Sequence, residues 1–171
     1  MKPSLTDTLC TRCGLCCGGS LFADVELAGH SEATAMEILR LNVEEGEGES
    51  ALLLQPCAAL KGKRCSIYPH RPGCCRTFEC RLLQQVKRGT LTVDHAAEKI
   101  AEMFKAIERV ERLAAQFGQR NARLPLKERY TDALANSADR IADPKANRKR
   151  KELNAAMVSV ERMIQETFLG I

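Results

Sequence analysis

The sequence predicts a mainly α protein, with a helical, bundle-like C-terminal half packed on a loop-rich N-terminal half that holds at most a small β-hairpin. Three observations predict this fold class. All nine cysteines lie between positions 10 and 80, glycines and prolines interrupt the same region, and apolar residues recur at helical spacing after it. We therefore expect a cysteine-rich region over residues 1–82 and a helical region over residues 83–171, together forming one compact domain.

The first half has short elements separated by breaks. One helix is expected from Ser31 to Leu41 with Ser31 as its N-cap. The stretch "EEGEGES" at 44–50 is expected to be an acidic loop because glycines interrupt it. Residues Leu52–Gln55 and Arg64–Tyr68 are expected to form a small antiparallel pair around "LKGK". A short helix should follow over about Arg76–Lys87.

The second half has stronger helical patterns. Apolar residues recur every three or four positions over Asp94–Phe117, with Thr92 placed to cap this helix and Gly118 placed to end it. A weaker pattern predicts a helix over Lys127–Ile141. In the last helix, an N-cap and a first-turn proline are supplied by Asp143-Pro144. One face of that helix carries Leu153, Ala156, Met157, Val160, Ile164, Thr167 and Phe168.

The N-terminal stretch "MKPSLTDTLC" lacks the apolar segment of a signal peptide. No apolar run approaches the roughly 20 residues that cross a bilayer. We therefore expect a cytoplasmic protein without membrane contact, in which thiols stay reduced. Disulfides and inert buried thiols explain nine cysteines poorly, and metal ligation explains them better.

The densest cysteine group is "CTRCGLCC" at residues 10–17. Two thiolates at positions i and i+3 can face one metal from a single turn, and Gly14 permits the tight backbone that this needs. A third cysteine at the same spacing is typical of iron–sulfur ligation. The ferredoxin pattern would continue with Cys and Pro where this chain has Ser20 and Leu21, so the motif is not that one. Because successive side chains diverge, Cys16 and Cys17 are expected to serve different metals, or a metal and a neighbouring group.

A second cysteine group follows in "PCAALKGKRCSIYPHRPGCCRTFEC". Residues 57–81 carry six basic side chains and one acidic side chain, whereas residues 24–49 carry eight acidic and one basic. Four thiolates around a divalent metal leave a negative charge, which nearby arginines would offset while lowering the thiol pKa values. Arg71 is placed between the cysteines for that role, and Ile67 and Tyr68 could shield the centre from water.

Other features point to ordinary roles. His30, His70 and His95 are expected to be surface or core histidines, although His70 lies within the second cysteine group. The basic run "KANRKRK" at 145–151 is expected to be a solvated helix face, so nucleic-acid binding is not expected. Neither a Ser/His/Asp arrangement nor a phosphate-binding loop is present. Catalysis, a protein partner and the oligomeric state are left open.

These motifs together resemble a known family, the CxxCxxCC or YkgJ-like cysteine-cluster proteins, which are associated with zinc or iron chelation. The resemblance covers the first half of the chain and rests on "CTRCGLCC", "PC" at 56–57, "RCSIYPHRP" at 64–72 and "CRTFEC" at 75–80. Two positions depart from the family pattern: Cys74 is an additional cysteine, and Glu79 replaces a proline. The resemblance implies eight metal ligands: Cys10, Cys13, Cys16, Cys17, Cys57, Cys65, Cys75 and Cys80.

Two functions are consistent with these observations. The first is a protein that holds a cysteine-ligated iron–sulfur cluster, of the 4Fe-4S type, with a redox or electron-transfer role. The second is a structural zinc protein, with one or two four-cysteine sites, that serves as a module for binding a partner. A surplus of thiols over one tetrahedral site favours the first function, and the division of eight cysteines into two sets of four favours the second.

Overall fold

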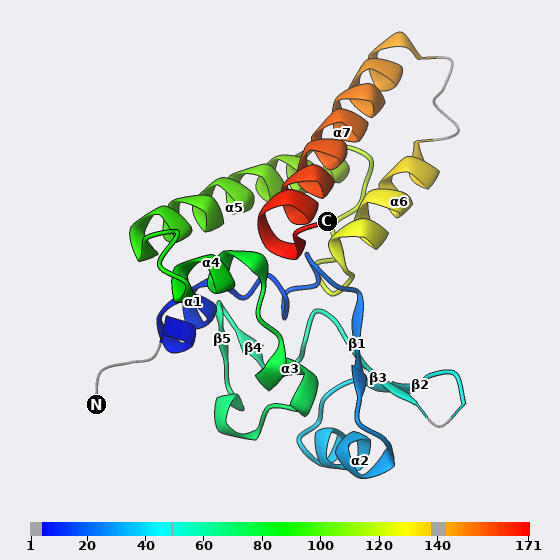
Figure 1. Ribbon diagram of the computed structural model, residues 1–171. Coiled ribbons are helices and arrows are strands. Elements are labelled where there is room, and N and C mark those ends of the chain that lie inside the picture. Colours follow the sequence, from blue (N-terminus) through cyan, green and yellow to red (C-terminus); the bar gives the residue numbers. More distant parts are fainter. Residues whose placement is uncertain (1–4, 49, 138–142) are drawn as a thin grey trace. The chain divides into compact units, whose positions relative to one another are not determined.

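Helices dominate the structure, which confirms the predicted fold class (Figure 1). The computed structural model describes residues 5–48, 50–137 and 143–171, and this part of the chain contains seven α-helices and two small antiparallel sheets. The chain divides into two compact units, Met1–Glu79 and Cys80–Ile171, which are considered separately below. Within the described part of the chain, no helix combines the length and the apolar character that crossing a membrane requires.

The first unit is built from short elements connected by loops. None of its described helices exceeds nine residues, and none of its described strands exceeds four. In chain order the elements are α1 (Leu5–Cys13), β1 (Asp24–Leu27), α2 (His30–Ile38), β2 (Val43–Glu45), β3 (Ala51–Leu54), β4 (Leu60–Lys61), β5 (Arg64–Cys65), the 3-10 helix η1 (Tyr68–His70) and α3 (Gly73–Thr77).

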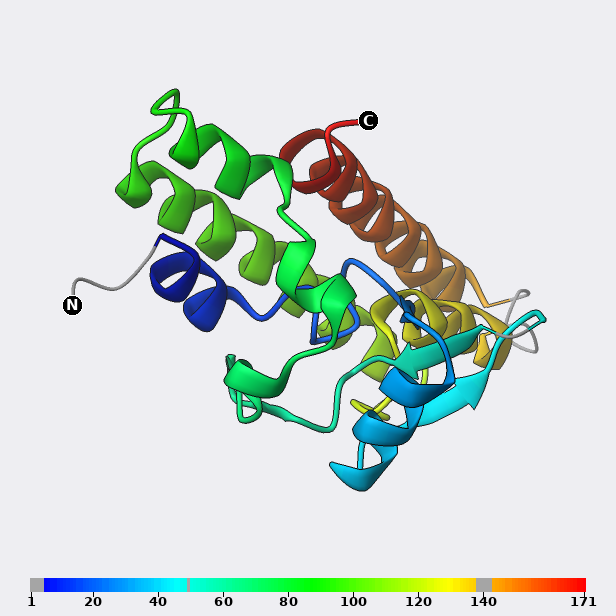
Figure 2. The same ribbon diagram turned by 60° about the horizontal axis from the view of Figure 1, so that its bottom comes forward.

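A three-stranded sheet in the order β1-β3-β2 supports this unit. The central strand β3 runs antiparallel to both neighbours, with Leu53 opposite Val25 on β1 and opposite Val43 on β2. Helix α2 contacts all three strands, and Figure 2 shows it running alongside the sheet. Leu53 is 1% exposed and packs in one apolar cluster with Leu27 and Met36. This cluster is the core of the first unit.

The expected pairing of Leu52–Gln55 with Arg64–Tyr68 is wrong. The apolar segment pairs with β1 and β2 instead, and part of the expected acidic loop at 44–50 belongs to β2. Residues Arg64–Cys65 pair with Leu60–Lys61 in a separate hairpin, where Gly62 takes the turn at a φ of +63°. Strands β1 and β2 are too short and too mixed in exposure to show a period-two pattern.

Two helix boundaries also differ from expectation. Helix α2 begins at His30, so its N-cap is Gly29 and not the expected Ser31. No side chain caps its first turn. The expected helix over Arg76–Lys87 is two helices, α3 and α4 (Arg81–Lys87), because residues 78 and 80 adopt extended backbone. The Phe78 ring packs edge-to-face on Phe22 with 5.2 Å between ring centroids, a long-range contact that local helix propensity does not anticipate.

All the described secondary-structure elements of the second unit are helices. These are α4, α5 (Val93–Ala115), α6 (Leu126–Asn136), α7 (Pro144–Met163) and the π-helical segment η3 (Ile164–Leu169). Helix α5 packs against α6 and α7, and α4 packs against α5 and η3 (Figure 1). The end of the expected helix over Lys127–Ile141 lies outside the described residues.

Both predicted N-caps of this unit are present. Thr92 Oγ1 accepts a hydrogen bond of 3.2 Å from the His95 backbone N–H, and Asp143 Oδ1 accepts one of 2.9 Å from the Lys145 backbone N–H. The apolar faces meet in a core in which Met103 and Leu153 are fully buried. The basic stretch at 145–151 is exposed except for residues 146 and 150, as is typical of a solvated helix face.

Gly14 places the end of α1 against the β4–β5 hairpin. Its φ is +67°, in the left-handed region that glycine adopts without steric cost. A Cβ at this position would lie 3.3 Å from both the Cα and the carbonyl oxygen of Lys63. The chain therefore requires glycine here for two reasons, its conformation and its close approach to the hairpin.

The first prediction compares two glycines with similar backbone conformation. Gly62 has a φ of +63°, but a Cβ there would meet nothing within 4 Å. Gly62→Ala should cost the first unit roughly 1 kcal/mol through conformation alone. Gly14→Ala should cost measurably more, because the hairpin must also move away from the new methyl group. Urea unfolding followed by circular dichroism measures both, and equal losses would contradict the importance of the close approach.

Candidate metal centre

The structure places eight of the nine cysteines in the first unit and one at the start of the second. All nine are half-buried, and none forms a disulfide. They come from five segments of the first unit and from the N-cap position of α4: Cys10 and Cys13 on α1, Cys16 and Cys17 in the following turn, Cys57 after β3, Cys65 on β5, Cys74 and Cys75 on α3, and Cys80 at the start of α4.

A backbone hydrogen bond joins the two cysteine motifs directly. The Cys57 N–H donates to the Cys17 carbonyl oxygen at 2.8 Å, across 40 positions of the sequence. Each side of this bond is held by a local turn: the Gly18 N–H donates to the Gly14 carbonyl at 2.8 Å, and the Leu60 N–H donates to the Cys57 carbonyl at 2.9 Å. The loop after α1 and the loop after β3 are thus fixed side by side.

The charges of several other cysteines act on the Cys17 thiol. Burial is the main reason that its pKa rises from its ordinary value of 9.0 to about 11, and charge repulsion from Cys57, Cys65 and Cys10 adds to the effect. Cys17 and Cys57 in turn contribute to the raised pKa of Cys75. Four thiols from four other segments are therefore within electrostatic range of Cys17.

Burial also raises the pKa of Cys57, with Cys65 adding to the rise. Hydrogen bonds from the backbone N–H groups of Ala59 and Leu60 act in the opposite direction and favour the thiolate. Thiols that repel one another once ionised, and that are partly desolvated, need a nearby cation to ionise together. A bound metal ion supplies such a cation, and a coordinating thiol is deprotonated.

Arg71 places a positively charged side chain near these thiols. Its guanidinium carbon lies 3.6 Å from the centre of the Tyr68 ring, and its Nε donates to the Tyr68 carbonyl at 3.0 Å. Its Nη1 donates to the Cys75 carbonyl at 3.4 Å. The guanidinium lowers the pKa of Cys17, although burial and the other thiols outweigh it. The side chain is therefore anchored at two points while its charge acts on the thiols.

The adjacent cysteines of α3 form a pair. Their sulfur atoms lie 4.0 Å apart, and the hydrogen bond between them is the main reason that the pKa of Cys74 is lowered to about 7 while that of Cys75 is raised. The Glu32 carboxylate, which is nearby, opposes the lowering at Cys74. Cys74, Cys57 and Cys65 all pack against the apolar core of the first unit.

Glu32 has a structural role that the sequence did not reveal. One carboxylate oxygen accepts a hydrogen bond of 2.7 Å from the Gly73 N–H at the start of α3, and the other accepts one of 2.7 Å from the Ala28 N–H. This carboxylate therefore ties α2 to the helix that carries Cys74 and Cys75. Nothing in the local sequence signals a bond that spans 41 positions.

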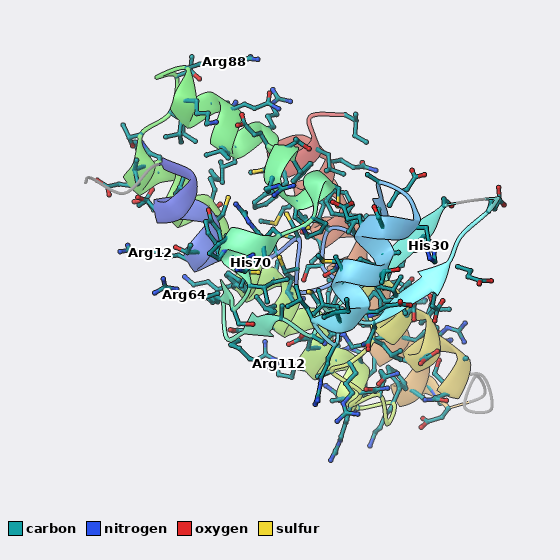
Figure 3. All side chains as sticks on the ribbon, turned by 90° about the horizontal axis from the view of Figure 1, so that it is seen from below. Arg12, His30, Arg64, His70, Arg88 and Arg112 are labelled. Atoms are coloured by element: carbon teal, nitrogen blue, oxygen red, sulfur yellow. The ribbon has the colours of Figure 1, made fainter. Side chains whose placement is uncertain are left out.

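The three histidines are spread over different elements. His30 is exposed on α2 and lies well apart from His70 (Figure 3). His95 Nδ1 lies 2.9 Å from Thr92 Oγ1, at the beginning of α5. Arg12 and Arg64, by contrast, lie near each other on α1 and β5, which are in contact (Figure 3).

The donor set fits a thiophilic metal. Soft thiolates, partial burial, backbone N–H groups directed at sulfur and a nearby guanidinium are the surroundings that zinc and iron sites use. Among residues 5–48, 50–137 and 143–171, no three Cys, His, Asp or Glu side chains converge closely enough to hold one metal ion as they stand. Ligation of one metal ion therefore requires that several of these cysteine side chains turn toward a common centre.

Comparison with known proteins places the chain in a family. No curated protein and no solved structure gives a match. Residues 9–108 match the CxxCxxCC family, which carries the description "Putative zinc- or iron-chelating domain". This match covers more than half of the 171 residues, including all nine cysteines. The chain belongs to the CxxCxxCC family of metal-chelating domains.

Proposed function

We propose that this protein holds an iron–sulfur cluster, of the 4Fe-4S type, ligated by cysteines of the first unit. The observation that carries the proposal is that Cys17 and the four thiols that interact with it electrostatically, those of Cys10, Cys57, Cys65 and Cys75, come from five separate segments of the first unit. A cluster of several iron atoms presents several coordination positions, so it can take ligands from more widely separated segments than one ion can.

The surroundings of the thiols support a redox role. Reduction potentials of iron–sulfur clusters depend on hydrogen bonds to sulfur, on nearby charge and on exposure to solvent. The N–H groups of Ala59 and Leu60, the Arg71 guanidinium and the apolar side chain of Ile67, which packs on the core, supply all three influences. We infer that the centre transfers electrons or supports a redox reaction of a partner protein.

A zinc centre is the second candidate. Eight cysteines divide into two sets of four, and the family description includes zinc. In that case the first unit would be a structural module whose loops present a surface to a partner. The predicted ligands are the same eight cysteines, of which Cys80 lies at the start of the second unit and the others lie in the first: Cys10, Cys13, Cys16, Cys17, Cys57, Cys65 and Cys75.

The metal is identified by purification without oxygen, a visible spectrum, and quantification of iron, acid-labile sulfide and zinc per chain. We expect a brown protein with iron and sulfide in equal amounts and with absorbance that bleaches on reduction. A colourless protein that contains zinc and no sulfide would overturn the cluster and favour the zinc module.

The ligand set is tested by two matched serine substitutions. Cys17→Ser should remove most of the bound metal, because Cys17 lies among four other thiols. Cys74→Ser should leave the metal content near that of the wild type, because Cys74 is the additional cysteine beside Cys75. Metal analysis of the purified variants gives the answer. Full metal in the first variant, or loss of metal in the second, would require a different assignment of ligands.

The metal-free protein should lose stability as the pH rises. The pKa of Cys17 is raised in the folded state from 9.0 to about 11, so folding favours the neutral thiol. The resulting stabilisation is complete below pH 9 and is lost progressively toward pH 11. Urea midpoints of reduced, metal-free protein at several pH values measure the effect. Cys17→Ser is the control and should show a flatter dependence; parallel curves for the two proteins would contradict the buried thiol as its source.

A further inference from the structure

A cavity of about 190 Å³ lies within the second unit, where the end of α5 meets the following loop and the start of α6. It lies beyond residues 9–108, the part of the chain that matches the CxxCxxCC family. Its volume is roughly that of six water molecules, so it suits a ligand with about as many non-hydrogen atoms. The cavity therefore raises a question of function separate from the metal centre.

One wall of the cavity is apolar. Val110 and Leu126 are each 1% exposed, and Ala114 is 2% exposed, so their surfaces in the cavity belong to the packed core. The small side chain of Ala115 leaves space beside them. A short hydrocarbon group placed against these side chains would lose part of its contact with water.

The lining of the cavity also includes an arginine whose hydrogen-bonding capacity is only partly used. Arg129 lines the cavity and its side chain is 12% exposed. Its Nη1 donates to Glu111 Oε1 at 2.6 Å. Its Nε is buried and has no hydrogen-bond partner in the part of the chain that the structure describes. Buried polar atoms nearly always have partners, so Arg129 retains hydrogen-bonding capacity beyond its ion pair with Glu111.

Charge and geometry narrow the class of acceptor. The cavity is lined by two guanidinium groups, of Arg120 and Arg129, and one carboxylate, of Glu111, which leaves one net positive charge. Gln119 is already engaged, since its Nε2 donates to Asp132 at 2.8 Å and its Oε1 accepts from the Asn121 N–H at 2.6 Å. A planar guanidinium is suited to a planar carboxylate, and a single net charge suits a monoanion better than a dianion.

We propose that this cavity binds a small aliphatic monocarboxylate. The carboxylate pairs with the Arg129 guanidinium beside Glu111, and the short hydrocarbon chain lies against Val110, Ala114 and Leu126. The proposal does not depend on which metal the first unit holds, because all the lining residues belong to the second unit.

Isothermal titration of the full-length protein with butyrate tests the proposal, with butyramide and inorganic phosphate as the comparison ligands. Millimolar affinity is expected for a ligand with so few atoms. Butyramide has the same shape without the charge, and phosphate has charge without the hydrocarbon chain. Each should bind at least about tenfold more weakly than butyrate. Absence of saturable butyrate binding, or equal binding of either comparison ligand, would overturn the proposal.

Three substitutions locate the binding. Arg129→Gln should weaken butyrate binding at least about tenfold by removing the charged donor. Ala115→Leu should weaken it to a similar extent by filling the cavity without changing its charge. Arg112→Gln is the matched control: Arg112 is an exposed arginine of α5 that does not line the cavity (Figure 3), and its variant should bind butyrate as the wild type does.

If Arg129→Gln fails to fold, Ala115→Leu decides the matter alone. Unchanged butyrate binding in a folded Ala115→Leu protein, or equal weakening in Arg112→Gln, would place the binding elsewhere and overturn the assignment.

Discussion

The first unit depends on holding thiols from distant segments close together although they repel one another once ionised. The hydrogen bond from the Cys57 N–H to the Cys17 carbonyl brings the two main cysteine loops side by side, and Arg71 contributes a single positive charge. Burial makes ionisation of Cys17 and Cys57 costly. A bound cationic centre would offset the repulsion between the thiolates. The positions of the loops and the binding of metal therefore depend on each other.

The rest of the first unit can be understood as support for these loops. Its sheet is small, and Cys57, Cys65 and Cys74 pack against its apolar core, so the cysteine-rich region and the core adjoin each other. Glu32 fixes α3 to α2 through two backbone N–H groups, which leaves the helix of Cys74 and Cys75 little freedom to move independently. Small metal-binding domains commonly gain much of their stability from the metal, and we expect the same of this unit.

The second unit has a different physical basis. Its helices bury a continuous apolar core around residues such as Met103 and Leu153, and their ends are capped by Thr92 and Asp143. This unit needs no metal to explain its packing. Among its described residues, Arg129 borders a cavity and has part of its hydrogen-bonding capacity unused. The chain thus combines a unit in which cysteines adjoin a small apolar core with a unit of helices packed around a hydrophobic core.

The sequence by itself determined the mainly α class, the helices α5 and α7 with their caps, and the membership of a cysteine-rich metal-binding family. Those features are local, since helical periodicity, capping residues and cysteine spacing can be read within a few turns of the chain. Only the tertiary structure decided which strand pairs with β3, that the chain leaves helix at Phe78 to pack on Phe22, and that Glu32 reaches Gly73. It also decided that thiols from distant segments act on Cys17, and that a cavity borders Arg129. Each of these rests on a contact between residues far apart in the sequence, whose free energy depends on the burial and neighbours that folding creates.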